Sequence, residues 1–184
     1  MENKTLYTVT IFSENTAGLL SQVTSVFTRR QLNIETLSVS PSALKGIHKF
    51  TITIFTTADE IEKVVRQIDK KVDILKAYYN TDDELVHQEI ALYKLSTPDF
   101  FKLPSVEELI RKYHAQILDI TEDYVVIQKT GHYAETQSLF EELSELTGVL
   151  QFIRSGRVAI TKSKIERLSD MLGGLDKKQK TTAD

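Results

Sequence analysis

The sequence predicts an α+β protein of two small domains, each with the element order strand, helix, strand, strand, helix, strand. Two observations support this prediction. Within the first 80 residues, apolar side chains twice alternate at period two and then change to helical spacing. The same series of patterns starts again after residue 84, so the chain carries two copies of one plan.

The first domain opens with a strand followed by a helix. Tyr7, Val9 and Ile11 point to one face of the strand and the threonines between them to the other, which is typical of a half-buried strand. Next comes the apolar stripe of an amphipathic helix, formed by Leu19, Leu20, Val23, Val26 and Phe27. We expect Asn15 or Thr16 to cap this helix, because either side chain can accept a hydrogen bond from its first free amides.

The rest of the first domain repeats the strand and helix patterns. Residues 33–40 are expected to form a second strand, and a turn over 41–46 leads into a third strand at 48–55, which alternates between apolar residues and threonine. Helical spacing predicts a second helix over 58–70, and residues 72–79 close the domain as its fourth strand.

The second domain is expected to follow the polar segment 81–87. Residues 90–95 form its first strand, and Ser105–Glu108 fits the capping box S-x-x-E at the start of a helix. The remaining expected elements are a hairpin with strands at 115–121 and 124–130, a helix ended by Gly148, and a final strand over 149–161 that bends near Ser155 and Gly156.

We therefore expect an α+β fold with two ferredoxin-like βαββαβ domains, in which each pair of helices covers one face of a four-stranded sheet. The expected boundaries are 1–80 for the first domain, 81–87 for a linker, 88–162 for the second domain and 163–184 for a partly disordered tail, with a short helix over 162–172. Domains this small bury only about 60% of their unfolded surface, so dimerisation is a physically reasonable way to bury more of it. Side-by-side pairing of two first domains would make an eight-stranded sheet.

Composition excludes several kinds of function. Hydrophobic residues make up 41% of the chain, but no apolar run approaches the roughly 20 residues of a transmembrane helix. The chain has no cysteine, which excludes disulfides, thiolate catalysis and the commonest zinc sites. A net charge of −3 with both signs interspersed gives no basic surface for nucleic acid. The first residues lead directly into a strand, so we expect no secretory signal and a cytoplasmic location.

The turn between the first strand and the first helix is the best candidate for a binding site. The first amides of a helix lack partners within it and carry about half a positive charge, so this helix start suits a carboxylate or a phosphate. Gly18 lets a ligand approach the backbone, and the Asn15 side chain offers both an acceptor and a donor. A carboxylate and an ammonium group could be bound side by side here, although an ordinary helix cap gives the same local pattern.

Beyond these patterns, the chain resembles a known family. The first 80 residues look like an ACT domain, an amino-acid-sensing module, and SENTAGLLSQVTSVFTRRQLNIETLSVSP is similar to the regulatory small subunit of acetolactate (acetohydroxyacid) synthase. The segment VDILKAYYNTDDELVHQEIALYKL resembles that family's passage into its second domain, and FIRSGRVAITK resembles its C-terminal part. The resemblance covers residues 5–162, and its most specific motifs are E-N-x-x-G-x-L and N-I-E-x-L.

The resemblance implies a regulatory subunit that has no catalytic residues of its own. Such a subunit forms a homodimer through its ACT domains, binds the catalytic (large) subunit and raises its activity. In many members it confers feedback inhibition by valine or another branched-chain amino acid on the pathway to valine, leucine and isoleucine. Thiamine diphosphate, magnesium and FAD would belong to the catalytic partner, and no cofactor or metal is expected in this chain.

By the same resemblance, the effector amino acid lies at the ACT dimer interface. Asn15 is expected to hold it, and the residues that complete this wall are Thr16, Ala17, Gly18, Leu19 and Leu20. Asn33 and Ile34 of the neighbouring subunit are expected to form the other wall. Where many members have glycine, this chain has Gln31, for which a left-handed turn is less favourable by about 1 kcal/mol.

Two other classes of function stay open on the residues alone. An ACT-type sensor could regulate another enzyme or transcription, although the sequence has no helix-turn-helix signature. A ferredoxin-like enzyme would need a convergent catalytic set, yet the four histidines are scattered one per segment. The acids at 82–84 are expected to be solvated. Arg29 and Arg30 either complement the dipole of the first helix or contact the catalytic subunit.

Overall fold

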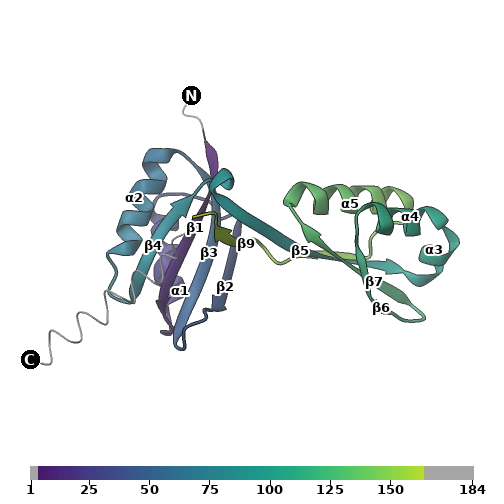
Figure 1. The fold of residues 1–184 in the computed structure, drawn as a ribbon, viewed down its shortest axis with the longest axis horizontal. Coiled ribbons are helices and arrows are strands. Elements are labelled where there is room, and N and C mark those ends of the chain that lie inside the picture. Colours follow the sequence, from purple (N-terminus) through teal and green to yellow (C-terminus); the bar gives the residue numbers. More distant parts are fainter. Residues whose placement is uncertain (1–3, 164–184) are drawn as a thin grey trace, which may run out of the picture. The chain divides into compact units, whose positions relative to one another are not determined.

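In the computed structural model, which describes residues 4–163, the chain folds into two units that repeat one topology (Figure 1). One unit comprises the described residues up to Val86 together with those from Ala159 on, and the other comprises His87–Val158. Each unit is an antiparallel sheet with helices, so the predicted α+β class is confirmed. The helix expected over 162–172 and the disordered tail lie outside the described residues, except for Lys162 and Ser163.

The first unit is a four-stranded antiparallel sheet in the order β2-β3-β1-β4. Its elements are β1 (Thr5–Glu14), α1 (Leu19–Arg29), β2 (Thr36–Pro41), β3 (Ile47–Thr56), α2 (Ala58–Asp69) and β4 (Ile74–Asn80). The central pair β1 and β3 is aligned along its whole length, from Thr5 opposite Thr56 to Glu14 opposite Ile47. Because β2 and β4 are the outer strands, each leaves one side of its backbone without a partner strand in this sheet.

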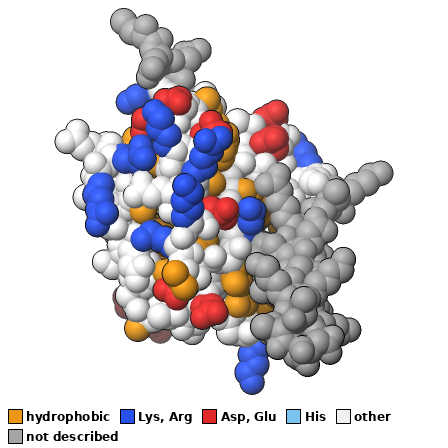
Figure 2. Space-filling view, turned by 90° about the vertical axis from the view of Figure 1, so that its left-hand side faces the viewer, with side chains coloured by type: hydrophobic (Ala, Val, Ile, Leu, Met, Phe, Trp, Pro, Cys, Tyr) orange, Lys and Arg blue, Asp and Glu red, His pale blue; other side chains and the backbone are white. Residues whose placement is uncertain are grey.

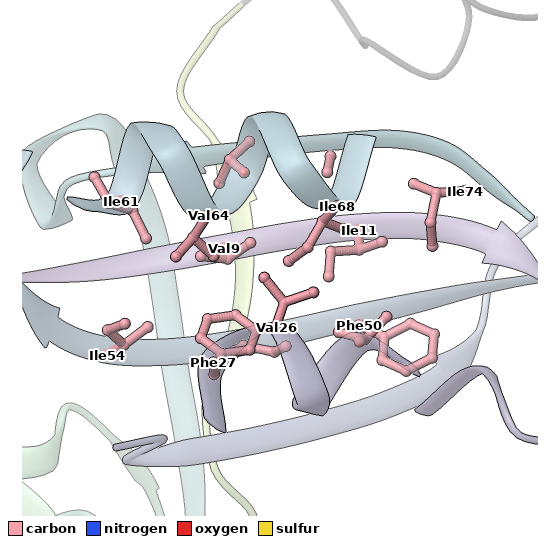
Figure 3. Close-up of a cluster of buried hydrophobic side chains, with 14 of the residues drawn as sticks. Val9, Ile11, Val26, Phe27, Phe50, Ile54, Ile61, Val64, Ile68 and Ile74 are labelled. Atoms are coloured by element: carbon pink, nitrogen blue, oxygen red, sulfur yellow. The ribbon is translucent and has the colours of Figure 1, made fainter. Parts of the chain in front are cut away.

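The core of the first unit lies between the sheet and its two helices. Ile61, Val64 and Ile68 of α2 point toward Val9 and Ile11 of β1 (Figure 3), and all five side chains are fully buried. A fully buried aliphatic side chain contributes about 1.5–3 kcal/mol relative to an exposed one. The residues at period two in β1 and at helical spacing in α2 therefore form the core that the sequence predicts.

The second unit repeats this arrangement. Its sheet contains the order β6-β7-β5-β8, so its second, third, first and fourth strands are neighbours, as in the first unit. The expectation of four strands is wrong for this sheet, because a fifth strand, β9 (Val158–Thr161), pairs with β5. The elements are β5 (Leu85–Ser96), α3 (Thr97–Lys102), α4 (Pro104–Lys112), β6 (Gln116–Ile120), β7 (Tyr124–Gly131), α5 (Tyr133–Leu146) and β8 (Gln151–Arg154). The predicted hairpin and the predicted helix before Gly148 are confirmed as β6–β7 and α5.

The last part of the described chain differs from the single strand expected over 149–161. It is divided into β8 and β9 (Val158–Thr161), and β9 pairs with β5. From Ala159 on, the chain again belongs to the first unit, where Lys49 Nζ donates to the Ala159 carbonyl oxygen at 2.6 Å. Burial lowers the pKa of Lys49. Residues 81–87, expected as a linker, contain the short helix η1 (Asp82–Glu84) and the first residues of β5.

The start of α4 corrects another expectation. Ser105 was predicted to cap this helix, but α4 begins at Pro104, follows Leu103 as the N-cap residue and has no side-chain cap. Proline suits the first helical position because its φ is already helical and it has no N–H to leave unpaired. The short helix α3, which also has proline in its first turn, was not expected from the sequence.

The C-terminal ends of α1 and α4 are alike. Gln31 and His114 follow these helices with φ of 55° and 50°. Leu32 N donates to Phe27 O at 3.0 Å, and Ala115 N donates to Ile110 O at 2.9 Å. These bonds close a Schellman turn in each unit, so the left-handed turn considered for Gln31 is present although the residue is not glycine.

Charged side chains of both signs cover the side of the first unit that Figure 2 shows, with small hydrophobic areas between them. On α2, Lys63 contacts Asp59 and Glu60, and Arg66 contacts Glu62. Exposed pairs of this kind are screened by solvent. They add little stability and keep this outer surface hydrated.

Candidate effector-binding site

The loop from Glu14 to Gly18 joins β1 to α1 and is held by backbone hydrogen bonds. Asn15 N donates to Gly46 O, and Thr16 N donates to Glu14 O, both at 3.0 Å. Gly18 is the N-cap residue of α1, with φ 84° and ψ −8°, and no side chain caps the helix. The expectation that Asn15 or Thr16 caps α1 is therefore wrong, because the left-handed turn at Gly18 separates both side chains from the first helical amides.

The first turn of α1 is consequently open to an anion. Within the described part of the chain, the amides of Gly18, Leu20 and Ser21 have no hydrogen-bond acceptor, and this turn contains no acidic residue. The start of α2 is different, since Thr57 Oγ1 accepts from Glu60 N at 3.4 Å. Unpaired helix amides carry about half a positive charge, so the start of α1 can bind a carboxylate or a phosphate.

Gly18 also leaves room for such a ligand. A Cβ added at this position would meet no other heavy atom within 4 Å. The positive φ is easy for glycine and strained for other residues, so glycine is required by the backbone and not by crowding. The space beside the Gly18 Cα is therefore open to a ligand.

The side chains of residues 15–20, which form the expected first wall of the effector site, differ in their exposure to solvent. Asn15, Thr16 and Ala17 are exposed, as expected for residues that meet a ligand. Leu19 is 2% exposed and anchors the loop in the first core, whereas Leu20 is 45% exposed. An exposed leucine beside anion-binding amides offers an apolar contact to a ligand that has both an acidic group and an aliphatic side chain.

Asn33 and Ile34, expected to form the second wall, precede β2 and do not belong to it. Asn33 is exposed, and its Nδ2 donates to Glu35 Oε1 at 3.1 Å, while Ile34 packs against the first core. They follow the C-terminus of α1, whose 11 residues span about 16 Å. A single chain therefore does not bring Asn33 and Asn15 together.

The edge strand β2 runs between these two places. Its last residue, Pro41, lies opposite His48, and the neighbouring Ile47 lies opposite Glu14, next to the Asn15 loop. The start of β2 is at the Asn33 end. Leu37 and Val39 of this strand are 36% and 41% exposed. An edge strand with partly exposed apolar side chains is suited to pair with a further strand.

Comparisons with known proteins place the chain in a family. A family model described as the small subunit of acetolactate synthase matches residues 88–163, and one described as an AHAS small subunit-like ACT domain matches residues 9–76. The acetolactate synthase small subunit of Buchnera aphidicola subsp. Baizongia pistaciae is 31% identical over 156 residues, which cover 84% of this chain and 97% of that protein. The chain belongs to the acetolactate synthase small subunit family.

Further members of the small subunit family match over similar lengths. The acetolactate synthase small subunit of Bacillus subtilis is 26% identical over 162 residues, covering 88% of this chain and 93% of that protein. The crystal structure of the small subunit from Thermotoga maritima has a TM-score of 0.77 at 22% identity and covers 87% of this chain and 99% of its own. The structural match confirms the fold, and membership of the small subunit family supports a regulatory role.

The described residues also show how other polar groups of this chain are arranged. No group of three or more histidine, aspartate or glutamate side chains there could hold a metal ion. The structure does bring the rings of His87 and His132 to 4.7 Å between centroids, which their separation in the sequence did not suggest. Thr81 is the N-cap residue of η1, and Glu84 completes a capping box with it. A hydrogen bond from the Thr81 side chain lowers the pKa of Asp83, and one from the Thr81 backbone lowers the pKa of Glu84.

The two arginines at the C-terminal end of α1, Arg29 in the helix and Arg30 as its C-cap residue, have different surroundings. Arg30 Nη1 lies 3.2 Å from Glu60 Oε2, and the same guanidinium donates to Gln67 at 3.3 Å, so it joins α1 to α2. Arg29 is exposed in the last turn of α1. No helix within residues 4–163 is long and apolar enough to cross a membrane.

Proposed function

We propose that this chain is the non-catalytic regulatory subunit of an acetolactate synthase in branched-chain amino acid biosynthesis. It binds the catalytic subunit, raises its activity and transmits feedback inhibition by a branched-chain amino acid, with valine as the leading candidate. The observation that carries the effector part of this proposal is the start of α1, where the left-handed Gly18 leaves helix amides open. Membership of the acetolactate synthase small subunit family supports the part of the proposal that names the catalytic subunit as the partner.

A branched-chain amino acid fits the site wall formed by residues 15–20 in three respects. Its carboxylate can accept from the open amides of Gly18, Leu20 and Ser21. Its ammonium group can donate to the carbonyl oxygen of the exposed Asn15 side chain. Its aliphatic side chain can bury apolar surface against Leu20, which favours valine, leucine and isoleucine over polar amino acids.

In this proposal, a second copy of the chain completes the site. Antiparallel pairing of β2 with β2 of the copy would join the two sheets of the first units into one of eight strands. It would bring Asn33 and Ile34 of the copy to the end of β2 that lies beside the Asn15 loop. Leu37 and Val39 would lose their partial exposure, which favours this edge for dimerisation.

The proposal assigns the chemistry to the partner. Thiamine diphosphate, magnesium and FAD belong to the catalytic subunit, and the complex works in the cytoplasm. For feedback, the amino acid must bind one arrangement of the subunits more tightly than another, because a ligand with equal affinity for both shifts nothing. An effector held between two copies can have such a preference, since its affinity depends on their relative position.

Reconstitution tests this function. The purified chain is mixed with an acetolactate synthase catalytic subunit, and co-elution and acetolactate formation are measured with and without each branched-chain amino acid. We expect co-elution, higher turnover and inhibition by one of them. A chain that binds the amino acid but neither co-elutes with the catalytic subunit nor changes its turnover would instead be a sensor for another enzyme or for transcription.

Calorimetry of Asn15→Ala tests the site. Loss of a hydrogen bond to a charged group should cost about 1.5–3 kcal/mol, which corresponds to a roughly 10- to 100-fold lower affinity for valine. Thr57→Ala is the matched control, because it removes a polar side chain before α2 and leaves the Asn15 loop untouched. An equal affinity of wild type and Asn15→Ala would remove Asn15 from the site.

A further inference from the structure

Glu35 lies beside the wall that Asn33 and Ile34 form, and neither the residue patterns nor the family resemblance assigned it a role. Asn33 Nδ2 donates to its Oε1 at 3.1 Å, and both side chains are exposed. Among the side-chain hydrogen bonds and ion pairs of residues 4–163, this is the one contact that Glu35 makes. Its carboxylate is thus directed at the amide of Asn33.

The backbone around this contact is fixed on both sides. Leu32 N donates to Phe27 O at 3.0 Å, and Glu35 N donates to Thr53 O at 2.9 Å. Between them, Ile34 packs against the first core. The fold therefore sets the positions of Asn33 and Glu35, and the freedom that remains to Asn33 lies in its side-chain torsions.

The chemistry of the carboxylate selects one orientation of the Asn33 amide. At neutral pH a carboxylate accepts hydrogen bonds and cannot donate them, whereas an amide has a donating and an accepting end of nearly the same shape. The Nδ2 group must turn toward Glu35, so Oδ1 is left as an acceptor on the exposed side. With a neutral partner at position 35, both orientations would be open to Asn33.

We propose that Glu35 is a positioning residue that makes Asn33 an acceptor for the ammonium group of the effector. The inference rests on the proposed function, because Asn33 reaches the effector only from a second copy of the chain. It divides the recognition of an amino acid between two copies: the open amides of α1 hold the carboxylate, and Asn33 of the other copy accepts from the ammonium group together with Asn15. The nearby negative charge of Glu35 also favours a cation at this place.

The test measures preference between two ligands and not affinity alone. The full-length chain is titrated in a calorimeter with valine and with the α-hydroxy acid analogue of valine, whose hydroxyl group can accept as well as donate. Glu35→Gln allows the Asn33 amide to turn over, so it should lower the preference for valine by about 10-fold, a change that corresponds to about 1.4 kcal/mol. A merely structural effect would weaken both ligands equally.

Two further variants sharpen this test. Glu62→Gln removes an exposed carboxylate on α2, outside the Asn15 loop and the segment of Asn33, and it should keep the wild-type preference. The combination of Asn33→Asp with Glu35→Gln reverses the pair, since the glutamine now donates to one carboxylate oxygen and leaves the other as an acceptor. This double variant should recover the preference for valine.

Every outcome of these titrations either supports or overturns the proposed role of Glu35. An unchanged preference in Glu35→Gln, an equal loss for both ligands, a larger change in Glu62→Gln, or no recovery in the double variant overturns the role of Glu35 and leaves the proposed function standing. A wild-type chain that binds no branched-chain amino acid overturns both. The combination of a fall in Glu35→Gln, no change in Glu62→Gln and recovery in the double variant supports the inference.

Discussion

Arg154 Nε lies 3.1 Å from Glu89 Oε1 inside the second unit, where both side chains are largely buried. Nε is not aligned as a donor to Glu89, so their attraction is mainly electrostatic. Thr136 Oγ1 donates to the same oxygen at 2.6 Å, and Arg154 Nη2 donates to Gln137 Oε1 at 2.5 Å. The guanidinium group also lies 4.2 Å from the centre of the Tyr133 ring. One polar cluster therefore joins β5, β8 and α5.

Removal of one member of this ion pair should be costly. Glu89→Ala leaves the Arg154 charge buried without its counter-charge, so the free energy of unfolding should fall by about 3 kcal/mol, as measured by urea unfolding. Glu89→Gln should cost less, because it keeps an acceptor for Thr136. Glu89→Leu combined with Arg154→Met should recover much of the loss, since apolar replacement of both partners removes the unpaired charge. A loss below about 1 kcal/mol in Glu89→Ala would contradict this account.

The backbone at Gly18 leads to a second prediction. Gly18→Ala meets no clash but must adopt φ near 84°, so it should lower the free energy of unfolding by about 1 kcal/mol and weaken valine binding, because the methyl group enters the space for the ligand. Gly148→Ala is the matched control, with φ 72° and open space around it. It should cost similar stability and leave valine binding unchanged. Equal binding losses in both variants would show that Gly18 acts through stability alone.

Replacement of the left-handed residues after α1 and α4 by glycine is expected to stabilise the protein. Gln31→Gly and His114→Gly should each raise the free energy of unfolding by about 0.5–1 kcal/mol, because the relief of φ strain exceeds the entropy that glycine adds to the unfolded chain. Arg30→Gly is the control, since Arg30 has φ −97° and no strain to relieve. It should destabilise the protein. Chemical denaturation of the three variants measures these differences, and a loss in both of the first two would refute the strain argument.

The buried side chain of Tyr93 should make the free energy of unfolding depend on pH in the alkaline range. Burial raises the pKa of its phenol, and the hydroxyl donates to Thr136 O at 2.7 Å. An unfolded tyrosine loses its proton near pH 10, whereas the folded one keeps it, so the folded state binds more protons there. This contribution to stability is fully present below about pH 10 and falls as the pH rises further. Lys49, whose pKa is lowered, contributes with the opposite sign.

Comparison with Tyr93→Phe isolates this contribution. The variant should lose about 1 kcal/mol at pH 7 because a buried hydrogen bond is missing. Above about pH 10 its stability should fall less steeply than that of the wild type, since it has no phenol to ionise. Urea unfolding of both proteins across this range gives the two slopes, and Lys49 affects both alike. Equal slopes would contradict the role assigned to Tyr93.

Much of the fold follows from periodic patterns in the sequence. Val9 and Ile11 at period two, and Ile61, Val64 and Ile68 at helical spacing, fall in the core as predicted. Such patterns predict which face of an element is buried, because burial of apolar surface decides it. The repeated order of elements along the chain, apart from the short helix α3, was predicted in the same way.

Local backbone geometry was harder to predict. The cap of α1 depends on the sign of φ at Gly18, and apolar spacing carries no information about that sign. Ser105 matched a capping motif, but the neighbouring Pro104 determined where α4 begins. Contacts such as Asn33–Glu35 and His87–His132 depend on side-chain torsions and on elements distant in sequence. For the candidate site, the sequence therefore indicated its residues but not how the backbone exposes the amides.

Because the chain returns to the first unit after the second, the two units cannot be separated cleanly by one cut in the chain. The carbonyl oxygen that Lys49 uses belongs to Ala159, which follows the whole second unit in the sequence. In topological terms, the second unit is an insertion into the first. A fragment ending at Asn80 would keep all four strands of its sheet but lose this acceptor. A single cut anywhere within 87–158 would leave both fragments holding part of the first unit.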